Sequence, residues 1–357
     1  MPADDLNSIP PRIIVGCWQL AAGHTPDREV DRSSQLEALA AYFKAGFTTF
    51  DCADIYTGVE DTLGDLRDLL RERWPDQVDQ LRIHTKFVPD RPVLPAIDRN
   101  YVESIIDRSL ARLRTDRLDL VQFHWWDFAV PGCVEVAQIL NGLRTAGKIS
   151  NFGLTNFDTR RTAEIVDAGV PVFSNQVQWS LLDQRPAAEF ARFAEEHNTK
   201  VFCYGGLAGG FLTDRYLGAD APVEPLSNRS LTKYKLIIDE AGGWDAFQSL
   251  LRALRDVADQ HKCSIAETAL AWVLQQPGVS AVIAGARVCA SAEAQEAVLA
   301  SLKRAQEIKL SEADLSNIAG GLAGLKAISG AIYEREREKT SAHAKIMRYN
   351  LNSQPRG

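Results

Sequence analysis

Short apolar runs alternate with amphipathic stretches along most of this chain. Eight runs read as buried strands, and the stretches between them carry apolar residues at helical spacing. Strands that are joined by helices must run parallel, because a helical crossover returns the chain to the same edge of a sheet. The predicted strands cover residues 12–16, 47–51, 81–87, 118–124, 149–154, 171–177, 200–204 and 279–285.

This alternation fits two architectures, a doubly wound sheet and a (β/α)8 barrel. Eight repeats at a spacing of roughly 30 residues favour the barrel. No linker or composition break divides the chain, so we predict one domain over residues 1–357. It is an α/β protein, a (β/α)8 TIM barrel with extended loops over about residues 10–305. A C-terminal helical tail follows over about residues 306–357.

Two further segments have predicted roles. The section 213–243 is irregular and long for a barrel loop, so we interpret it as a lid over cofactor or substrate. The run EREREKTSAHAK (334–345) is predicted to be a solvated helix with His343 on the surface.

Composition excludes several classes of protein. Hydrophobic residues make up 45% and charged residues 24%, as in soluble globular proteins. The net charge of −7 and the lack of a basic stripe argue against nucleic acid as a partner. Six scattered cysteines, without CxxC, predict free thiols and no metal site. The N-terminus resembles no signal peptide and no run reaches membrane-spanning length, so we expect a cytoplasmic protein without a membrane partner.

Candidate chemistry lies where the predicted strands end. Asp51, Lys86 and His124 end three consecutive strands, and Tyr56 lies in the loop after the first of them. A lone lysine here is usually solvated, and a lone histidine is usually a core residue with satisfied hydrogen bonds. The combination is more informative, because neighbouring barrel strands bring their carboxyl ends to one mouth. A buried lysine also needs a carboxylate nearby, which Asp51 supplies.

Such a cluster predicts proton transfer to a carbonyl oxygen. An ammonium beside a phenol lowers the pKa of the tyrosine from about 10 towards the range of a general acid/base. His124 is then placed to donate a hydrogen bond to a substrate carbonyl. No serine or cysteine stands out as a nucleophile, so a hydride donor would complete the chemistry.

At this point the sequence resembles a known family, the aldo-keto reductases. GFTTFDCADIY (46–56) resembles the signature that holds the Asp and Tyr of the family's tetrad, which correspond to Asp51 and Tyr56. HTKF (84–87) supplies its lysine, Lys86, and LDLVQFHW (118–125) its histidine, His124. Further matches follow in family order: GLTNF (153–157), SNQVQWSLL (174–182), YGGLAGGFLTDRY (204–216) and WVLQQPGVSAVIAGAR (272–287).

The resemblance implies an NADP(H)-dependent oxidoreductase on a (β/α)8 barrel. Thr155, Asn156 and Gln176 would hold the nicotinamide carboxamide, and Tyr204 would stack on the ring. The loop that opens at Gly205 would bring backbone N–H groups to the pyrophosphate. Basic residues would hold the phosphates, with Arg287 on the adenosine 2′-phosphate, which favours NADPH over NADH. The remaining implied cofactor residues are Gly206, Leu207, Ala208, Arg215, Arg229, Gly285 and Gln295.

The sequence departs from the family pattern near the last predicted strand. IAGAR (283–287) replaces the family's IPGAR, and no Glu-Asn pair follows it, so Gln295 stands as the equivalent position. Trp18, Ile55, Trp125 and Trp126 fall at or just past strand ends, where they would wall an apolar substrate mouth. Tryptophans that pack loops onto the barrel are the plain alternative.

Three functions are consistent with these features to different degrees. The first is reduction of a small-molecule aldehyde or ketone by NADPH, or the reverse oxidation. The second is an NADPH-binding regulatory subunit, because channel-associated members of the family retain the tetrad. The third is an aldolase with a Schiff base on Lys86, which leaves Asn156, Gln176 and Tyr204 unexplained. The sequence leaves open whether the protein is a monomer or a homo-oligomer.

Overall fold

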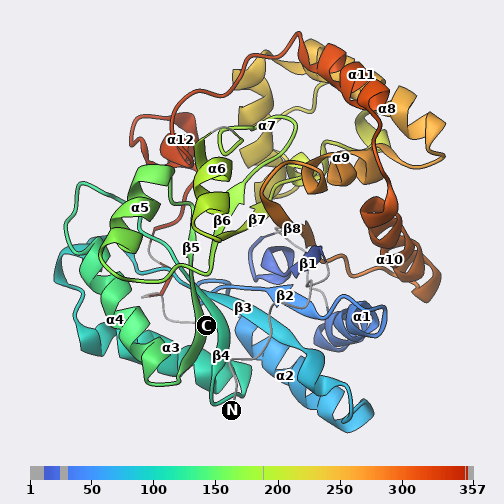
Figure 1. The fold of residues 1–357 in the computed structure, drawn as a ribbon. Helices are drawn as coiled ribbons and strands as arrows, with labels where there is room; N and C mark the ends of the chain where they lie inside the picture. The colour runs from blue at the N-terminus through green and yellow to red at the C-terminus, as the bar shows by residue number, and fades with distance from the viewer. Residues whose placement is uncertain (1–11, 25–30, 188, 350, 353–357) are drawn as a thin grey trace.

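Eight parallel strands close into a barrel surrounded by helices (Figure 1). The computed structural model describes residues 12–24, 31–187, 189–349 and 351–352 of the 357-residue chain. The predicted (β/α)8 fold with a helical tail is confirmed, whereas the N-terminal segment expected to lack a signal peptide lies outside the described residues. The strands are β1 (Ile13–Gly16), β2 (Thr49–Asp51), β3 (Arg82–Phe87), β4 (Leu118–Phe123), β5 (Ile149–Thr155), β6 (Ser174–Gln178), β7 (Lys200–Tyr204) and β8 (Val279–Gly285).

Helices connect successive strands, and several begin at a side chain that caps the helix. Asp98, Asp158 and Ser264 each accept a hydrogen bond from a first-turn N–H, which satisfies a donor that the helix leaves unpaired. The barrel helices are α1 (Arg32–Lys44), α2 (Val59–Arg73), α3 (Arg99–Leu113), α4 (Cys133–Thr145), α5 (Thr159–Asp167), α6 (Glu189–Glu196), α7 (Arg229–Ala241), α8 (Trp244–Gln260), α9 (Ile265–Leu274) and α10 (Ala292–Glu307).

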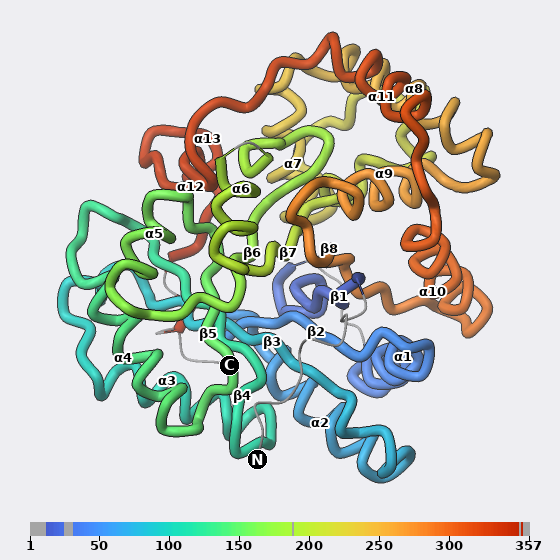
Figure 2. The backbone as a smooth tube through the Cα atoms, in the orientation of Figure 1, coloured from blue at the N-terminus to red at the C-terminus, as the bar shows by residue number. Residues whose placement is uncertain are grey.

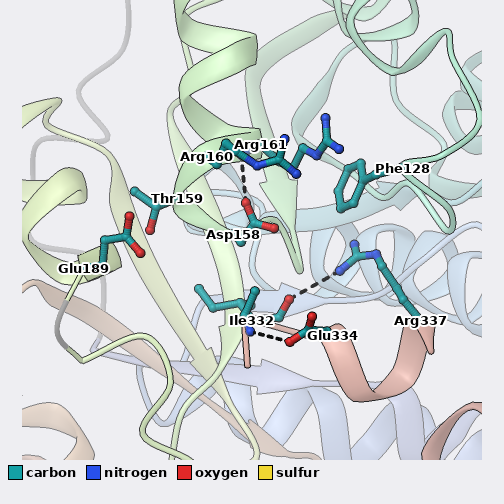
Figure 3. A pocket seen from close by; sticks show the side chains of 10 residues that line it. Phe128, Asp158, Thr159, Arg160, Arg161, Glu189, Ile332, Glu334 and Arg337 are labelled. Atoms are coloured by element: carbon teal, nitrogen blue, oxygen red, sulfur yellow. Dashed lines mark hydrogen bonds between the residues drawn. The ribbon is translucent and has the colours of Figure 1, made fainter. Parts of the chain in front are cut away.

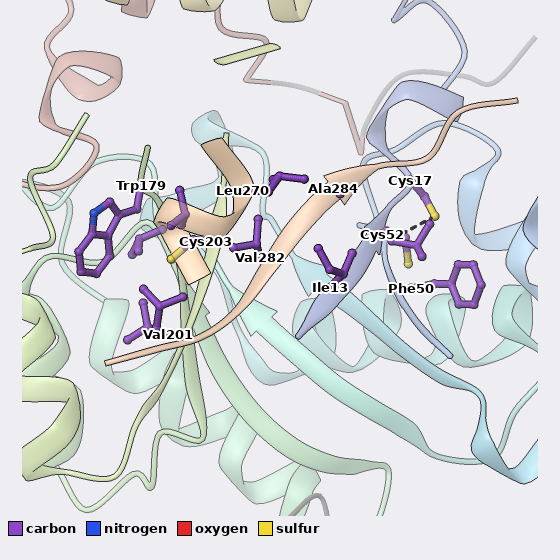
Figure 4. Close-up of a cluster of buried hydrophobic side chains, with 14 of the residues drawn as sticks. Ile13, Cys17, Phe50, Cys52, Trp179, Val201, Cys203, Leu270, Val282 and Ala284 are labelled. Carbon is purple, nitrogen blue, oxygen red and sulfur yellow. Dashed lines mark hydrogen bonds between the residues drawn. The ribbon is translucent and has the colours of Figure 1, made fainter. Parts of the chain in front are cut away.

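Apolar packing fills both faces of the barrel wall. Inside the barrel, Ile14, Leu120, Phe202 and Ala281 form a buried layer. Outside it, strand residues such as Val201 and Val282 pack against the helices in the main core (Figure 4). The interior is therefore closed by apolar side chains, and polar groups gather towards the carboxyl ends of the strands.

The section after β7 is more regular than predicted. Residues 213–243 were expected to form an irregular lid, but α7 occupies Arg229–Ala241 and packs against the 3₁₀ turn at Ala208–Gly210. Its buried face, which includes Tyr234 and Ile238, holds this helix on the barrel. The expectation of an irregular chain is wrong for this half of the section, whereas the lid role stays a prediction.

The C-terminal tail is also not the solvated helix that the charge run suggested. After α11 (Glu312–Leu322), the chain forms α12 (Glu334–Arg337) and α13 (Ala342–Lys345), which lie together at the end of the red tube (Figure 2). Glu336 and His343 are buried, and His343 contacts Glu240 of α7 at 3.1 Å. Beyond α13, Asn352 donates hydrogen bonds to Asp54 and to the Val88 carbonyl. The alternating charges of residues 334–339 did not indicate the ion pairs that these residues form in the folded chain. Among the described residues, no helix combines the length and apolarity needed to span a bilayer.

Candidate active site

A buried ion pair joins the ends of β2 and β3. Lys86 Nζ lies 2.5 Å from Asp51 Oδ1 and 2.7 Å from the carbonyl oxygen of Cys52. Burial alone would lower the pKa of Lys86, but the Asp51 carboxylate, together with Tyr56 and Cys52, outweighs burial and raises that pKa. The lysine is therefore a fixed cation, as the sequence predicted.

Two amides complete the surroundings of Asp51. Gln122 and Gln176 each donate to Asp51 Oδ2, at 2.9 and 2.7 Å. Gln176 also donates to Gln122 Oε1 at 2.8 Å, so its amide nitrogen faces the ion pair, and its contact with nicotinamide stays a prediction. Sequence reasoning missed Gln122, although an amide inside the apolar run LDLVQFH was a signal for it.

Tyr56 lies at the mouth beside this pair. Lys86 Nζ is 5.1 Å from the centroid of its ring, and Trp18 packs 6.5 Å away, centroid to centroid. Loss of water raises the pKa of Tyr56 to about 12, and Lys86 offsets only part of that effect. The expected lowering of this pKa is therefore not found, because burial outweighs the lysine.

His124 projects from the end of β4 into a buried environment. Its Nδ1 lies 3.1 Å from the Thr155 carbonyl, and its Nε2 has no hydrogen-bond partner among the described residues. Burial, followed by the charge of Arg337, lowers the pKa of His124 to about 3. The ring is thus neutral, and we assign the proton to Nδ1 because a carbonyl can only accept. Nε2 is then an acceptor, not the expected donor.

Residues expected to hold nicotinamide cluster at the ends of β5, β6 and β7. Tyr204 donates from its hydroxyl to Asn156 Oδ1 at 2.8 Å, and the Asn156 N–H donates to the Gln176 carbonyl at 2.8 Å. Thr155 Oγ1 also reaches that carbonyl, at 3.2 Å. Asn156 has a φ of 64°, a left-handed conformation that costs energy and is often found at functional sites.

The glycine loop after Tyr204 packs closely against α7. Gly205 has a φ of 80°, and a Cβ there would lie 2.2 Å from the Tyr234 hydroxyl. At Gly209 a Cβ would lie 2.7 Å from the same ring. Gly206, Leu207 and Ala208 continue the loop. Close packing against Tyr234 therefore explains why Gly205 and Gly209 are glycines, whether or not the loop binds a phosphate.

The basic residues implied by the resemblance lie at separate places around the mouth. Arg287 is exposed after β8, and its N–H donates to the Tyr42 hydroxyl at 3.0 Å. Gln295 accepts from Cys289 N nearby, and Gly285 leaves space for Gln19. Arg229 donates to the Ile346 carbonyl of the tail at 3.2 Å. Arg215 is exposed on another turn, over Tyr216.

The tryptophans after β4 differ in their surroundings. Trp125 is fully buried against Phe123 and donates to the Val130 carbonyl at 3.2 Å, so it packs a loop and does not wall the mouth. Trp126 lies edge-on to His124 at 4.4 Å between centroids, beside the catalytic candidates. Ile55 and Trp18 are partly exposed.

A cavity of about 330 Å³ opens between α5 and the tail, and its lining contains none of Asp51, Tyr56, Lys86 and His124 (Figure 3). Its lining includes Phe128, Asp158, Arg161, Ile332 and Arg337. Tyr333 of the tail also lies beside His124, a contact that the sequence did not predict. No set of three or more His, Cys, Asp or Glu side chains in the described ranges is arranged to hold a metal ion.

Comparison with known proteins identifies the family of this chain. The family described as "Aldo/keto reductase family" matches residues 12–319. Aldo-keto reductase YhdN of Bacillus subtilis is 26% identical over 77% of this chain and 81% of its own. L-glyceraldehyde 3-phosphate reductase of Escherichia coli O157:H7 is 28% identical over 77% and 80%.

Two further similarities differ in extent. A crystal structure of the thermostable aldo-keto reductase Tm1743 with the inhibitor epalrestat superposes with a TM-score of 0.65 at 23% identity, over 87% of this chain and 95% of that one. Flagellar radial spoke protein 5 of Chlamydomonas reinhardtii is 31% identical over 174 residues, 43% of this chain but only 33% of that protein. The family match spans most of the chain, and this protein belongs to the aldo/keto reductase family.

Proposed function

We propose that this chain is an NADP(H)-dependent oxidoreductase that reduces aldehyde or ketone carbonyls to alcohols, or runs the reverse reaction, with Tyr56 as general acid/base. One observation supports this best: the buried Lys86–Asp51 pair lies beside the Tyr56 ring, at a barrel mouth that also holds Asn156 and Tyr204. The barrel, about residues 10–305, and its tail are proposed to form one domain.

Each residue of the pair has a separate role. Asp51 keeps Lys86 charged, and the ammonium stabilises the phenolate that Tyr56 becomes after it gives its proton to the carbonyl oxygen. Bound NADPH supplies the hydride. His124 orients the substrate through Nε2, which accepts a hydrogen bond from a hydroxyl group of the substrate or product.

The nucleotide is proposed to lie along the mouth from Tyr204 towards Arg287. The Tyr204 ring, the Asn156 amide and three glycines with positive φ (Gly205, Gly209 and Gly210) fit a planar ring followed by phosphates. Arg287 is exposed near Gln295, and such an exposed guanidinium suits the 2′-phosphate of NADPH. The name of the E. coli relative supports an aldehyde as substrate. All six cysteines are free thiols, in keeping with a cytoplasmic location.

The test is direct. Binding of NADPH and of NADH is followed by fluorescence, and turnover is then measured with a panel of aldehydes and ketones. We expect NADPH to bind more tightly and at least one aldehyde to be reduced. No affinity for either nucleotide would end the proposal.

A second candidate is a nucleotide-binding regulatory subunit. The partial match to a radial spoke protein favours it, because that protein's name places it in a larger assembly. NADPH binding without turnover across the panel would support this candidate over the enzyme.

A further inference from the structure

The tail segment Ile332–Arg337 lies over the catalytic cluster. The ring of Tyr333 is 5.5 Å from that of His124, centroid to centroid. Lys233 Nζ is 5.1 Å from the Tyr204 centroid and 5.3 Å from the Tyr333 centroid. One ammonium therefore lies near both tyrosine rings, and Tyr333 lies beside His124 while sharing this ammonium with Tyr204.

Arg337 fastens the end of this segment to the barrel. Its guanidinium donates to the Asn156 carbonyl at 2.8 Å and to the Trp125 carbonyl at 3.1 Å. It also lies 4.4 Å from the centre of the Phe128 ring. Arg337 of the tail therefore already bonds the backbone carbonyl of Asn156, a residue proposed to hold nicotinamide.

Glu336 is seated between two buried cations. One carboxylate oxygen lies 3.4 Å from Lys233 Nζ, and the other lies 3.9 Å from Arg185. Arg185 also pairs with Asp183 at 2.6 Å, so Lys233 depends on Glu336 for its compensating charge. Both contacts of Glu336 are longer than the roughly 2.8 Å of a strong charge-assisted hydrogen bond. This is an ion pair with little directional bonding to hold it.

Tyr333 itself is held in a left-handed conformation, with φ at 60°. This conformation is uncommon and costly for a tyrosine, and it persists only where surrounding contacts enforce it. Here the left-handed conformation is enforced by the contacts that Tyr333, Glu336 and Arg337 make with the barrel. Releasing the segment would relieve this strain.

We propose that Ile332–Arg337 is an internal occupant of the active site, latched by Glu336 between Arg185 and Lys233, and that it must leave before a nicotinamide nucleotide binds. The proposal rests on the proposed function, since it takes Tyr204, Asn156 and His124 as the seat of nicotinamide and carbonyl. Tyr333 lies beside His124 and shares the Lys233 ammonium with Tyr204, so its ring and the nicotinamide ring compete for this place.

Two consequences can be measured. Only molecules in which Ile332–Arg337 has left the site can bind NADPH. The apparent Kd therefore rises as the fraction of molecules with the tail in place increases. Weakening the latch should therefore tighten binding. NADPH should also increase hydrogen exchange of the backbone amides in residues 333–345, which closed contacts protect.

The main variant is Glu336→Gln, which keeps shape but leaves Lys233 without its counter-charge in the closed state. We expect its Kd for NADPH to fall about tenfold or more. Glu338→Gln is the matched control, because Glu338 is exposed and contacts Arg335, and its Kd should equal that of the wild type. A Kd for Glu336→Gln that is unchanged or higher overturns the proposal.

Tyr333→Gly guards against a folding effect of Glu336→Gln. Glycine accepts the left-handed backbone without strain and removes the ring, so this variant should also bind NADPH more tightly. Weaker binding would make Tyr333 part of the nucleotide site and overturn the latch. If wild-type protein binds NADPH while the amides of residues 333–345 stay protected from hydrogen exchange, the latch proposal is wrong but the proposed function still stands. If no variant binds either nucleotide, the proposed function fails and the latch fails with it.

Discussion

Lys86 Nζ lies 2.5 Å from Asp51 Oδ1, and the two side chains are only 6% and 5% exposed to solvent. A charge pair so well buried is costly in free energy unless its geometry is good and its remaining polar atoms are bonded. Gln122, Gln176 and the Cys52 carbonyl provide those bonds. The barrel thus holds a permanent cation 5.1 Å from the Tyr56 ring.

Lys86→Met should leave Asp51 buried without its partner. We expect a loss of about 3–5 kcal/mol in the free energy of unfolding, measured with urea. The double variant Lys86→Met/Asp51→Asn should recover much of that stability, because no charge is then left unpaired, but should remain inactive. Equal stability of the single and double variants would contradict the role of this pair.

Tyr56→Phe removes the proton donor but retains the ring. The rate of carbonyl reduction should fall by about 10²–10⁴-fold or more, the contribution typical of a positioned acid. The Kd for NADPH should stay within about threefold, since no nucleotide group is proposed to bond this hydroxyl. Tyr216→Phe, on a distant turn, is the control and should turn over normally. Normal turnover of Tyr56→Phe would show that another group is the acid.

Asp54 should make stability depend on pH. Burial, followed by the charge of Glu60, raises the pKa of Asp54 to about 7, against about 3.9 in an unfolded chain. The folded state binds more protons between these values, so the free energy of unfolding should fall as pH rises from about 4 to 7. The contribution is on the order of 2–4 kcal/mol.

The matched variant is Asp54→Asn, whose amide oxygen can still accept from Val88 N and Asn352. Urea unfolding across this pH range should show a smaller slope for the variant than for the wild type. Parallel curves would mean that Asp54 ionises as freely in the folded state as in the unfolded one.

His124 should be neutral throughout the working range, since burial and Arg337 hold its pKa at about 3. The ring resonances of His124 in NMR spectra should not titrate between pH 5 and 8, although free imidazole changes charge near pH ~6.5. A midpoint near 6.5 that is absent in His124→Asn would show that the ring can charge and donate through Nε2.

Gly205→Ala should destabilise the loop after β7 through two effects. Left-handed backbone costs about 1–2 kcal/mol for alanine, and the new Cβ would lie 2.2 Å from the Tyr234 hydroxyl. Gly210→Ala shares only the backbone effect, because its φ is 110° and no atom of the described residues lies within 4 Å of a Cβ there. Thermal unfolding should therefore show a larger loss for Gly205→Ala, and equal losses would argue against close packing.

The repeating pattern of the chain determined the barrel. Buried apolar runs alternate with amphipathic helices, and local signals such as capping by Asp98 and Asp158 begin those helices where the pattern predicts. The meeting of Asp51, Lys86 and Tyr56 followed as well, because neighbouring parallel strands end at one mouth. These features depend on spacing along the sequence.

Only the tertiary structure decided what surrounds that mouth. Glu336 and Lys233 are 103 positions apart, and nothing in the charged run around Glu336 indicated that one of its carboxylates is buried. The pKa of Tyr56 likewise depends on how much water the folded chain removes, which outweighs the nearby lysine. Desolvation and long-range charge pairing depend on three-dimensional position, so a periodic pattern of residues cannot report them.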